Sequence, residues 1–225
     1  ADSEQSLAML ATWRGDATAA RAHFQRALEL RQKHLGTDHG DLPELMFGLA
    51  MTDYQSRRTA EAKATLEATL AMLRRLFGDV HHGIGHCLSL LGTIAADTND
   101  LPGAERHYQE AMVVFRKVEG EKSREVATLV HNLASLARQR RDAPTALRLL
   151  EDSMVMRREL FGPDDASVAD GLHLTGLVHE DVGAFADALP ALEEAVRIRT
   201  KVLGASHPET VSVTKARDRV RGKLR

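Results

Sequence analysis

Apolar residues recur along this chain at intervals of three and four, a spacing that places them on one face of an α-helix. Leu45 and Leu49 follow this spacing in one stretch, and Leu66 and Leu70 follow it in the next. A polar break at residues 57–59 separates the two stretches. The pattern therefore predicts two amphipathic helices joined by a short turn.

This two-helix pattern returns with a period of 42 residues. A glycine closes each period, and small and bulky residues inside it keep the same spacing. Glycine suits the end of a helix because it readily adopts left-handed backbone angles, and we expect those angles here. A fixed long period predicts a stack of similar units rather than one closed core. The glycines are Gly36, Gly78, Gly120, Gly162 and Gly204.

Five units follow from this period, at about residues 1–36, 37–78, 79–120, 121–162 and 163–204. We expect the first helix of each unit, helix A, at residues 3–14, 41–56, 82–97, 124–140 and 166–182. The second, helix B, is expected at residues 17–34, 59–76, 101–118, 143–160 and 185–202. A last helix at 208–223 has an apolar stripe and a charged outer side, and is expected to cap the array. The prediction is an all-α solenoid of antiparallel helix pairs, forming a single array over residues 1–225.

The repeat resembles the tetratricopeptide repeat (TPR). That family has a small residue in helix A, an alanine early in helix B, a bulky residue four positions on and a small residue three after it. The second unit shows these as Ala50, Ala62, Leu66 and Thr69. The usual period is about 34 residues, and about eight more lengthen each helix by roughly one turn. The longer form is similar to the kinesin light chain type, whose loops carry Leu-Gly-x-x-His-Pro, as residues 203–208 do here.

This resemblance implies a right-handed superhelix whose concave face is lined by the A helices and holds an extended peptide or a partner helix. Positions three before, one after and four after the small residue of helix A map onto that face. Asn132 is added because the family uses asparagine there to bond a ligand's main chain; the equivalent residues are Gly48, Leu90 and Leu174. The predicted partner-binding residues are Met9, Phe47, Met51, Tyr54, Ser89, Thr93, His131, Asn132, Ser135, Arg138, His173, Leu177 and Glu180.

Two functions are open on this basis. The first is a non-catalytic scaffold that binds a protein or peptide, with the apolar side chains as anchors and the polar ones setting the register. The second is a regulatory or oligomerising arm of a larger, bacterial-style signalling protein, packing on its own domains or on another copy. Leu7, Leu10 and Trp13 motivate the second, because no preceding unit covers their helix. The absence of an initiator Met is interpreted as a sign that the chain is a piece of a longer protein.

Composition narrows the partners. A formal net charge of −2 gives no basic field for nucleic acid. The single cysteine, Cys87, excludes an internal disulfide and indicates a reducing cytoplasm; its period equivalents include Leu45 and Leu129, so we expect it to be buried. No signal peptide is found, and no apolar run reaches the roughly 18 residues of a membrane span.

Histidines are the main candidates for further chemistry. His82 and His86 are four residues apart and would share a helix face that could bind a metal, but no carboxylate of fixed spacing completes the site. His86, His131 and His173 map onto the A-helix surface, where they could sense pH between about 5 and 8, bind an acidic ligand or simply form a polar lining. No nucleophile elbow or phosphate-binding loop is present. We therefore expect no catalysis and no cofactor.

Overall fold

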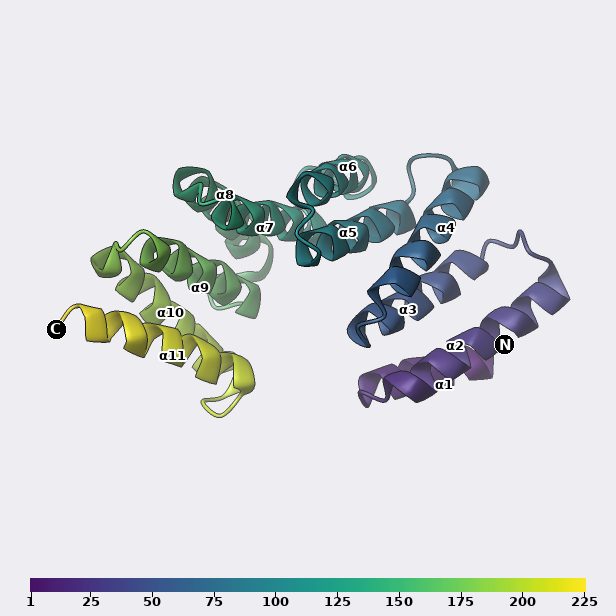
Figure 1. Ribbon diagram of the computed structural model, residues 1–225, viewed down its shortest axis with the longest axis horizontal. Helices are drawn as coiled ribbons and strands as arrows, with labels where there is room; N and C mark the ends of the chain where they lie inside the picture. The colour runs from purple at the N-terminus through teal and green to yellow at the C-terminus, as the bar shows by residue number, and fades with distance from the viewer. The chain divides into compact units, whose positions relative to one another are not determined.

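The computed structural model describes residues 1–225 and consists of eleven α-helices without a strand (Figure 1). The predicted range of every helix is confirmed to within one residue at each end. The A helices are α1 (Asp2–Trp13), α3 (Leu42–Gln55), α5 (His82–Asp97), α7 (Arg124–Gln139) and α9 (Ala166–Asp181). The B helices are α2 (Ala17–Leu35), α4 (Thr59–Phe77), α6 (Leu101–Glu119), α8 (Ala143–Phe161) and α10 (Phe185–Leu203), and α11 (Pro208–Lys223) follows them.

The chain forms two compact units, Ala1–Val118 and Glu119–Arg225. From here on, these two are called the first and second unit, and each 42-residue helix pair is called a repeat. In the first, each of α1 to α4 packs against the helix that follows it. In the second, α7 to α11 pack in the same consecutive way. No helix combines the length and the hydrophobicity that crossing a membrane requires. The expectation of one continuous array stays a prediction.

Within a helix pair, the small residue of helix A faces the bulky residue of helix B. A Cβ added to Gly92 would lie 2.6 Å from the ring of Tyr108, and one added to Gly176 would lie 2.4 Å from Leu192. These distances are too short for any larger side chain. The small and bulky positions that keep the period are therefore the two halves of one close-packed interface.

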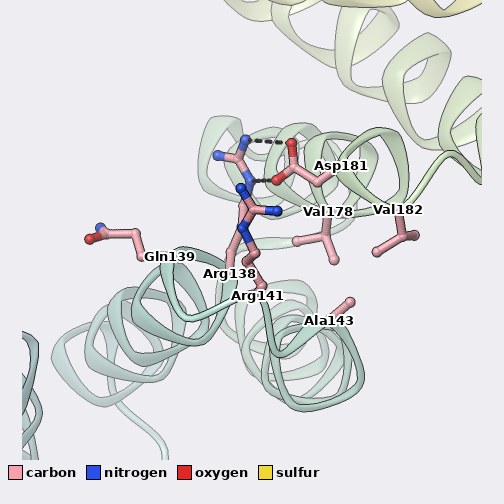
Figure 2. Close-up of a pocket in the computed structure, with 7 residues that line it drawn as sticks. All are labelled: Arg138, Gln139, Arg141, Ala143, Val178, Asp181 and Val182. Carbon is pink, nitrogen blue, oxygen red and sulfur yellow. Dashed lines mark hydrogen bonds and ion pairs between the residues drawn. The ribbon is translucent and has the colours of Figure 1, made fainter.

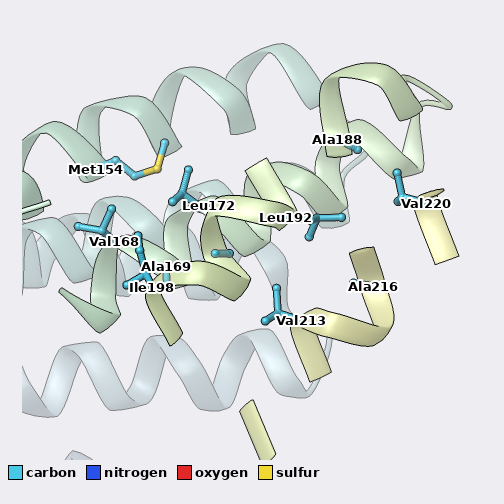
Figure 3. Packing of buried hydrophobic residues seen from close by; sticks show 11 residues of the cluster. Met154, Val168, Ala169, Leu172, Ala188, Leu192, Ile198, Val213, Ala216 and Val220 are labelled. Atoms are coloured by element: carbon cyan, nitrogen blue, oxygen red, sulfur yellow. The ribbon is translucent and has the colours of Figure 1, made fainter. Parts of the chain in front are cut away.

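Helix α11 closes the second unit. Its Val213, Ala216 and Val220 are buried in one cluster with Leu192 of α10 and Val168 of α9 (Figure 3). The predicted cap is confirmed, because an apolar stripe on α11 covers a face of the last helix pair that would otherwise meet water.

The period glycines end the B helices in a backbone conformation more restricted than the expected one. Gly36 has φ 84° and ψ 176°, and Gly162 has φ 87° and ψ 165°. The expected left-handed angles are therefore wrong in ψ: φ is positive, but ψ is extended. This region is open to glycine almost alone, which explains why no other residue replaces glycine at the five positions.

The turn from helix A to helix B also keeps the period, through a residue with positive φ. This residue is glycine or asparagine in three of the repeats. In the other two it is Arg57 or Arg141, with φ of 62° and 60°. After Arg141, the Asp142 N–H donates to the Ala137 carbonyl, and the Asp142 carboxylate accepts the Thr145 N–H of α8. One residue thus closes helix A and caps helix B. The positive-φ residues are Gly15, Arg57, Asn99, Arg141 and Gly183.

The loop histidines are structural. The Nδ1 atoms of His39, His81 and His207 accept the N–H two residues ahead, at 3.2, 3.1 and 3.3 Å, where an A helix or α11 begins. Ser123 and Asp165 occupy the same place in the period and cap α7 and α9, Ser123 through the N–H three residues ahead and Asp165 through the N–H two residues ahead. His81 and His207 are therefore the N-terminal caps of α5 and α11, whereas His39 bonds the N–H of Asp41, the residue that precedes α3.

Cys87 is buried on α5, as predicted. Burial raises the pKa of its thiol to about 12. The thiol stays protonated at neutral pH, so it acts as a small apolar side chain in the core.

Candidate partner-binding site

The predicted partner-binding residues lie on the A helices and differ in exposure. Met9 on α1 is 61% exposed. The residues on the other four A helices are half-buried, as expected of side chains that line a surface without filling the core. In the first unit these are Phe47, Met51 and Tyr54 of α3 and Ser89 and Thr93 of α5; in the second they are His131, Asn132, Ser135 and Arg138 of α7 and His173, Leu177 and Glu180 of α9.

Tyr54 links α3 to α5. Its hydroxyl donates to Oδ2 of Asp97 at 2.6 Å. Burial, followed by this hydrogen bond, raises the pKa of Tyr54 to about 12, so the hydroxyl stays a donor. Only its ring is left to contact a partner.

A pocket of about 370 Å³ lies where α3, the end of α4 and the start of α5 meet. Phe47 and the predicted metal pair, His82 and His86, line it, together with Phe77 and His81. The rings of His82 and His86 are 4.6 Å apart in an edge-to-face arrangement, and His81 stacks on Phe77 at 4.5 Å. No group of three His, Cys, Asp or Glu side chains suited to a metal exists in the chain. The histidines therefore form an aromatic lining with no third metal ligand.

His131 on α7 is largely enclosed, and its Nδ1 has no hydrogen-bond partner. Burial, followed by the charge of Arg157, lowers the pKa of His131 to about 4, against the opposing effect of Asp170. Burial, followed by Arg199, also lowers the pKa of His173. Of the three roles considered for His131, sensing of pH between 5 and 8 does not fit this pKa, because the side chain stays neutral throughout that range.

Two buried arginines next to these histidines were not foreseen. Arg157 of α8 is 5% exposed and Arg199 of α10 is 7% exposed. Arg199 pairs with Asp170 at 2.6 Å and donates to the Glu209 carbonyl at 2.9 Å, and Arg157 donates to the Ser167 carbonyl. The sequence holds a signal for them, because three of the five residues at this place in the period are arginines, Arg31, Arg157 and Arg199, and the other two are the apolar Leu73 and Phe115. A cation at a core position marks a buried polar cluster.

Arg138 joins the ends of α7 and α9. Its Nε and Nη2 donate to the two carboxylate oxygens of Asp181 at 2.6 and 3.3 Å (Figure 2). A pocket of about 390 Å³ lies beside this pair, lined also by Gln139, Arg141 and Ala143 and by Val178 and Val182. Glu180, the neighbour of Asp181, is paired with Arg219 of α11. The predicted Arg138 and Glu180 thus already have partners within the chain.

The lone asparagine of the predicted surface has a physical reason to be alone. A Cβ on Gly48 would lie 2.5 Å from the ring of Phe24, and Leu90 and Leu174 are buried. Gly48 therefore has no room for a side chain, and the other two places are buried and apolar. Asn132 is half-buried, and its amide makes no hydrogen bond within the chain.

The model of the tetratricopeptide repeat matches residues 1–75, 54–117 and 125–201 of this chain. The chain therefore belongs to the tetratricopeptide repeat family, as its sequence pattern predicts. Proteins of this family are in general non-catalytic interaction scaffolds. Among curated proteins, no sequence matches the chain.

Solved structures share this fold. BtubC (BKLC) from P. vanneervenii is 25% identical, with a TM-score of 0.77, over 92% of this chain and 82% of that one. A putative kinesin light chain with nearly identical TPR-like repeats from Podosopora anserina is 17% identical, with a TM-score of 0.71, over 90% and 96%. A Rap protein complexed with competence and sporulation factor is 13% identical, with a TM-score of 0.71, over 96% of this chain and 62% of that one.

Proposed function

We propose that this protein is a scaffold whose A-helix surface binds an extended segment or a helix of a partner protein. The observation that carries the proposal is the partial exposure of the side chains on that surface. Eleven of its predicted residues, from Phe47 to Leu177, are half-buried, so that each keeps part of its surface accessible. Among them, the Asn132 amide has an unused donor and acceptor, which suit a peptide main chain.

Two similar structures support a peptide as the ligand. The Rap conjugation gene regulator of plasmid pLS20 is in complex with the Phr* peptide, and the chain matches 53% of its length. The Rap protein named above holds competence and sporulation factor. A cytoplasmic location is part of the proposal and is supported by the free thiol of Cys87.

The test begins with selection of binding peptides from a random library on the wild-type protein. The affinity of a selected peptide is then measured for Asn132→Ala and for Phe47→Ala. We expect a loss of about tenfold or more for a residue in the site, because a truncated anchor or an unpaired ligand amide costs on the order of 1.4 kcal/mol or more.

Gln109→Ala provides the matched control, since it removes an exposed amide from helix B. Its affinity is expected to equal that of the wild type. Wild-type affinity in both Asn132→Ala and Phe47→Ala would show that peptides bind elsewhere.

Self-association through α1 is a second candidate function, favoured by a separate observation. Trp13 is 87% exposed. Leu10 is also exposed, although Ile94 and Leu136, its equivalents in α5 and α7, are buried. We expect light scattering to report a mass that rises with concentration for the wild type and not for Trp13→Ser. A mass that stays monomeric at all concentrations would rule this function out.

A further inference from the structure

The pocket at the ends of α7 and α9 has a counterpart in the first unit, two periods of 42 residues earlier. That counterpart lies at the ends of α3 and α5. In both, an A-helix residue bonds an aspartate on the next A helix, and a positive-φ arginine and a glutamine lie beside them. The corresponding residues are Arg138 and Tyr54, Gln139 and Gln55, Arg141 and Arg57, and Asp181 and Asp97.

The two pockets differ in charge. In the second unit, Arg138 neutralises Asp181 through a bidentate pair, which leaves the charge of Arg141 unbalanced. In the first unit, Tyr54 donates a hydrogen bond to Asp97 but brings no charge, so Asp97 balances Arg57. The residues that line the α7–α9 pocket therefore carry a net positive charge, and those of the α3–α5 pocket carry none.

Arg141 is held in place by its backbone. Its N–H donates to the Arg138 carbonyl, and the bonds of Asp142 on either side fix the turn. The Arg141 side chain is exposed and has no carboxylate partner, whereas its neighbour Arg140 is engaged within the chain. Asp142 does not line the pocket, because its carboxylate caps α8. The turn thus fixes the backbone position from which an unpaired guanidinium extends beside the pocket.

The remaining wall is apolar. Ala143, Val178 and Val182 line it, and Figure 2 shows Val178 and Val182 on the α9 side beside Asp181. In the α3–α5 pocket, Thr59 and Thr98 stand at the places of Ala143 and Val182. An aliphatic wall below a cation fits a carboxylate on a short aliphatic stem.

We propose that the α7–α9 pocket binds a glutamate side chain of a partner protein, with Arg141 contacting the carboxylate and the valines contacting the methylenes. Only the source of the glutamate rests on the proposed scaffold function. Residues of this chain alone line the pocket, at the ends of α7 and α9 and in the turn before α8, so its binding can be tested without a partner protein.

The probe is N-acetyl-glutamate N-methylamide, and its glutamine analogue is the neutral control. Both are titrated into ¹⁵N-labelled protein at fixed pH and ionic strength, and amide shifts are followed by NMR. We expect saturable shifts at Arg141, Asp142 and Val182 with the glutamate compound, and at least tenfold weaker binding of the glutamine compound. Equal binding of the two compounds would overturn the proposal.

Arg141→Gly separates binding from folding. Glycine accepts positive φ, so this variant is expected to unfold at the wild-type temperature or above it while its affinity for the probe falls at least tenfold. Arg57→Gly makes the same backbone change in the uncharged pocket and is expected to leave the affinity unchanged. Wild-type affinity in Arg141→Gly, or an equal loss in Arg57→Gly, would overturn the assignment.

The outcomes also distinguish the two proposals. Probe binding that depends on Arg141, together with peptides that ignore Asn132 and Phe47, would leave the pocket standing and reject the A-helix surface. Peptide binding that depends on Asn132, without probe binding, would do the reverse.

Discussion

The helix pairs around α3 and α5 and those around α7 and α9 share one backbone plan and differ in the chemistry placed on it. Helices α4 and α6 bury Leu73 and Phe115 where α8 and α10 bury Arg157 and Arg199. Glycine stops, positive-φ turns and N-terminal caps recur in both. The comparison teaches that a few backbone positions hold the repeat, while the side chains between the helices are free to change from apolar to charged.

The largest expected effect is at Phe115. Its ring packs closely against Gly85, where an added Cβ would lie 2.7 Å away, so a truncation empties a tightly packed part of the core. Phe115→Ala is expected to lower the free energy of unfolding by about 3–5 kcal/mol. Urea unfolding followed by circular dichroism measures this value.

Arg157→Met at the equivalent place is the contrast. It roughly keeps the volume and removes a buried charge, but it leaves the Ser167 carbonyl without its donor, so we expect a loss of about 1–3 kcal/mol. A loss as large as that of Phe115→Ala would show that the buried arginine stabilises its unit as much as an aromatic core residue does.

His131 gives the second unit a sensitivity to acid. Its pKa is about 4 in the folded protein and about 6.5 in an unfolded chain, so protonation favours unfolding. The contribution of neutral His131 to the free energy of unfolding is fully present above about pH 6.5. It is lost as the pH falls toward 4, and the loss amounts to up to about 3 kcal/mol. His131→Gln is expected to flatten this part of the stability profile, measured by urea unfolding between these pH values.

The exposed His34, changed to Gln, is the control for that profile. It is expected to leave the slope unchanged. An identical slope in the wild type and in His131→Gln would contradict the assignment.

The smallest effect compares the two links between A helices. Arg138–Asp181 is an ion pair and Tyr54–Asp97 joins a neutral group to a charged one. Double-mutant cycles with Arg138→Gln and Asp181→Asn, and with Tyr54→Phe and Asp97→Asn, are each expected to give about 0.5–1 kcal/mol. Only the Arg138–Asp181 coupling should fall as salt rises from about 0.05 M to about 1 M. Equal salt dependence would remove this distinction.

The sequence predicts the helices and their pairing well, because the period aligns every 42-residue repeat with four others. It also identifies Cys87 as a core residue, since its equivalents include Leu45 and Leu129. Two features of the candidate site lie beyond such reasoning. The neutral state of His131 depends on burial and on Arg157, a residue 26 positions away that becomes its neighbour only in the fold. The charge of the pocket beside Arg141 depends on which carboxylate pairs with Arg138. The spacing of residues along the sequence does not identify that carboxylate.

The residue shared by the end of one helix and the start of the next has a consequence for how such a chain can change in length. Asp142 leaves no spare position in its turn, so an insertion there would disconnect two helices at once. A segment cut from Glu121 to Gly162 is different, because it carries its own opening cap, Ser123, its helix pair and its closing glycine. Duplicating this segment adds a complete cassette without a new kind of junction. The protein can therefore grow or shrink in whole steps, and a designer can move Arg138 and Arg141 between scaffolds as one part.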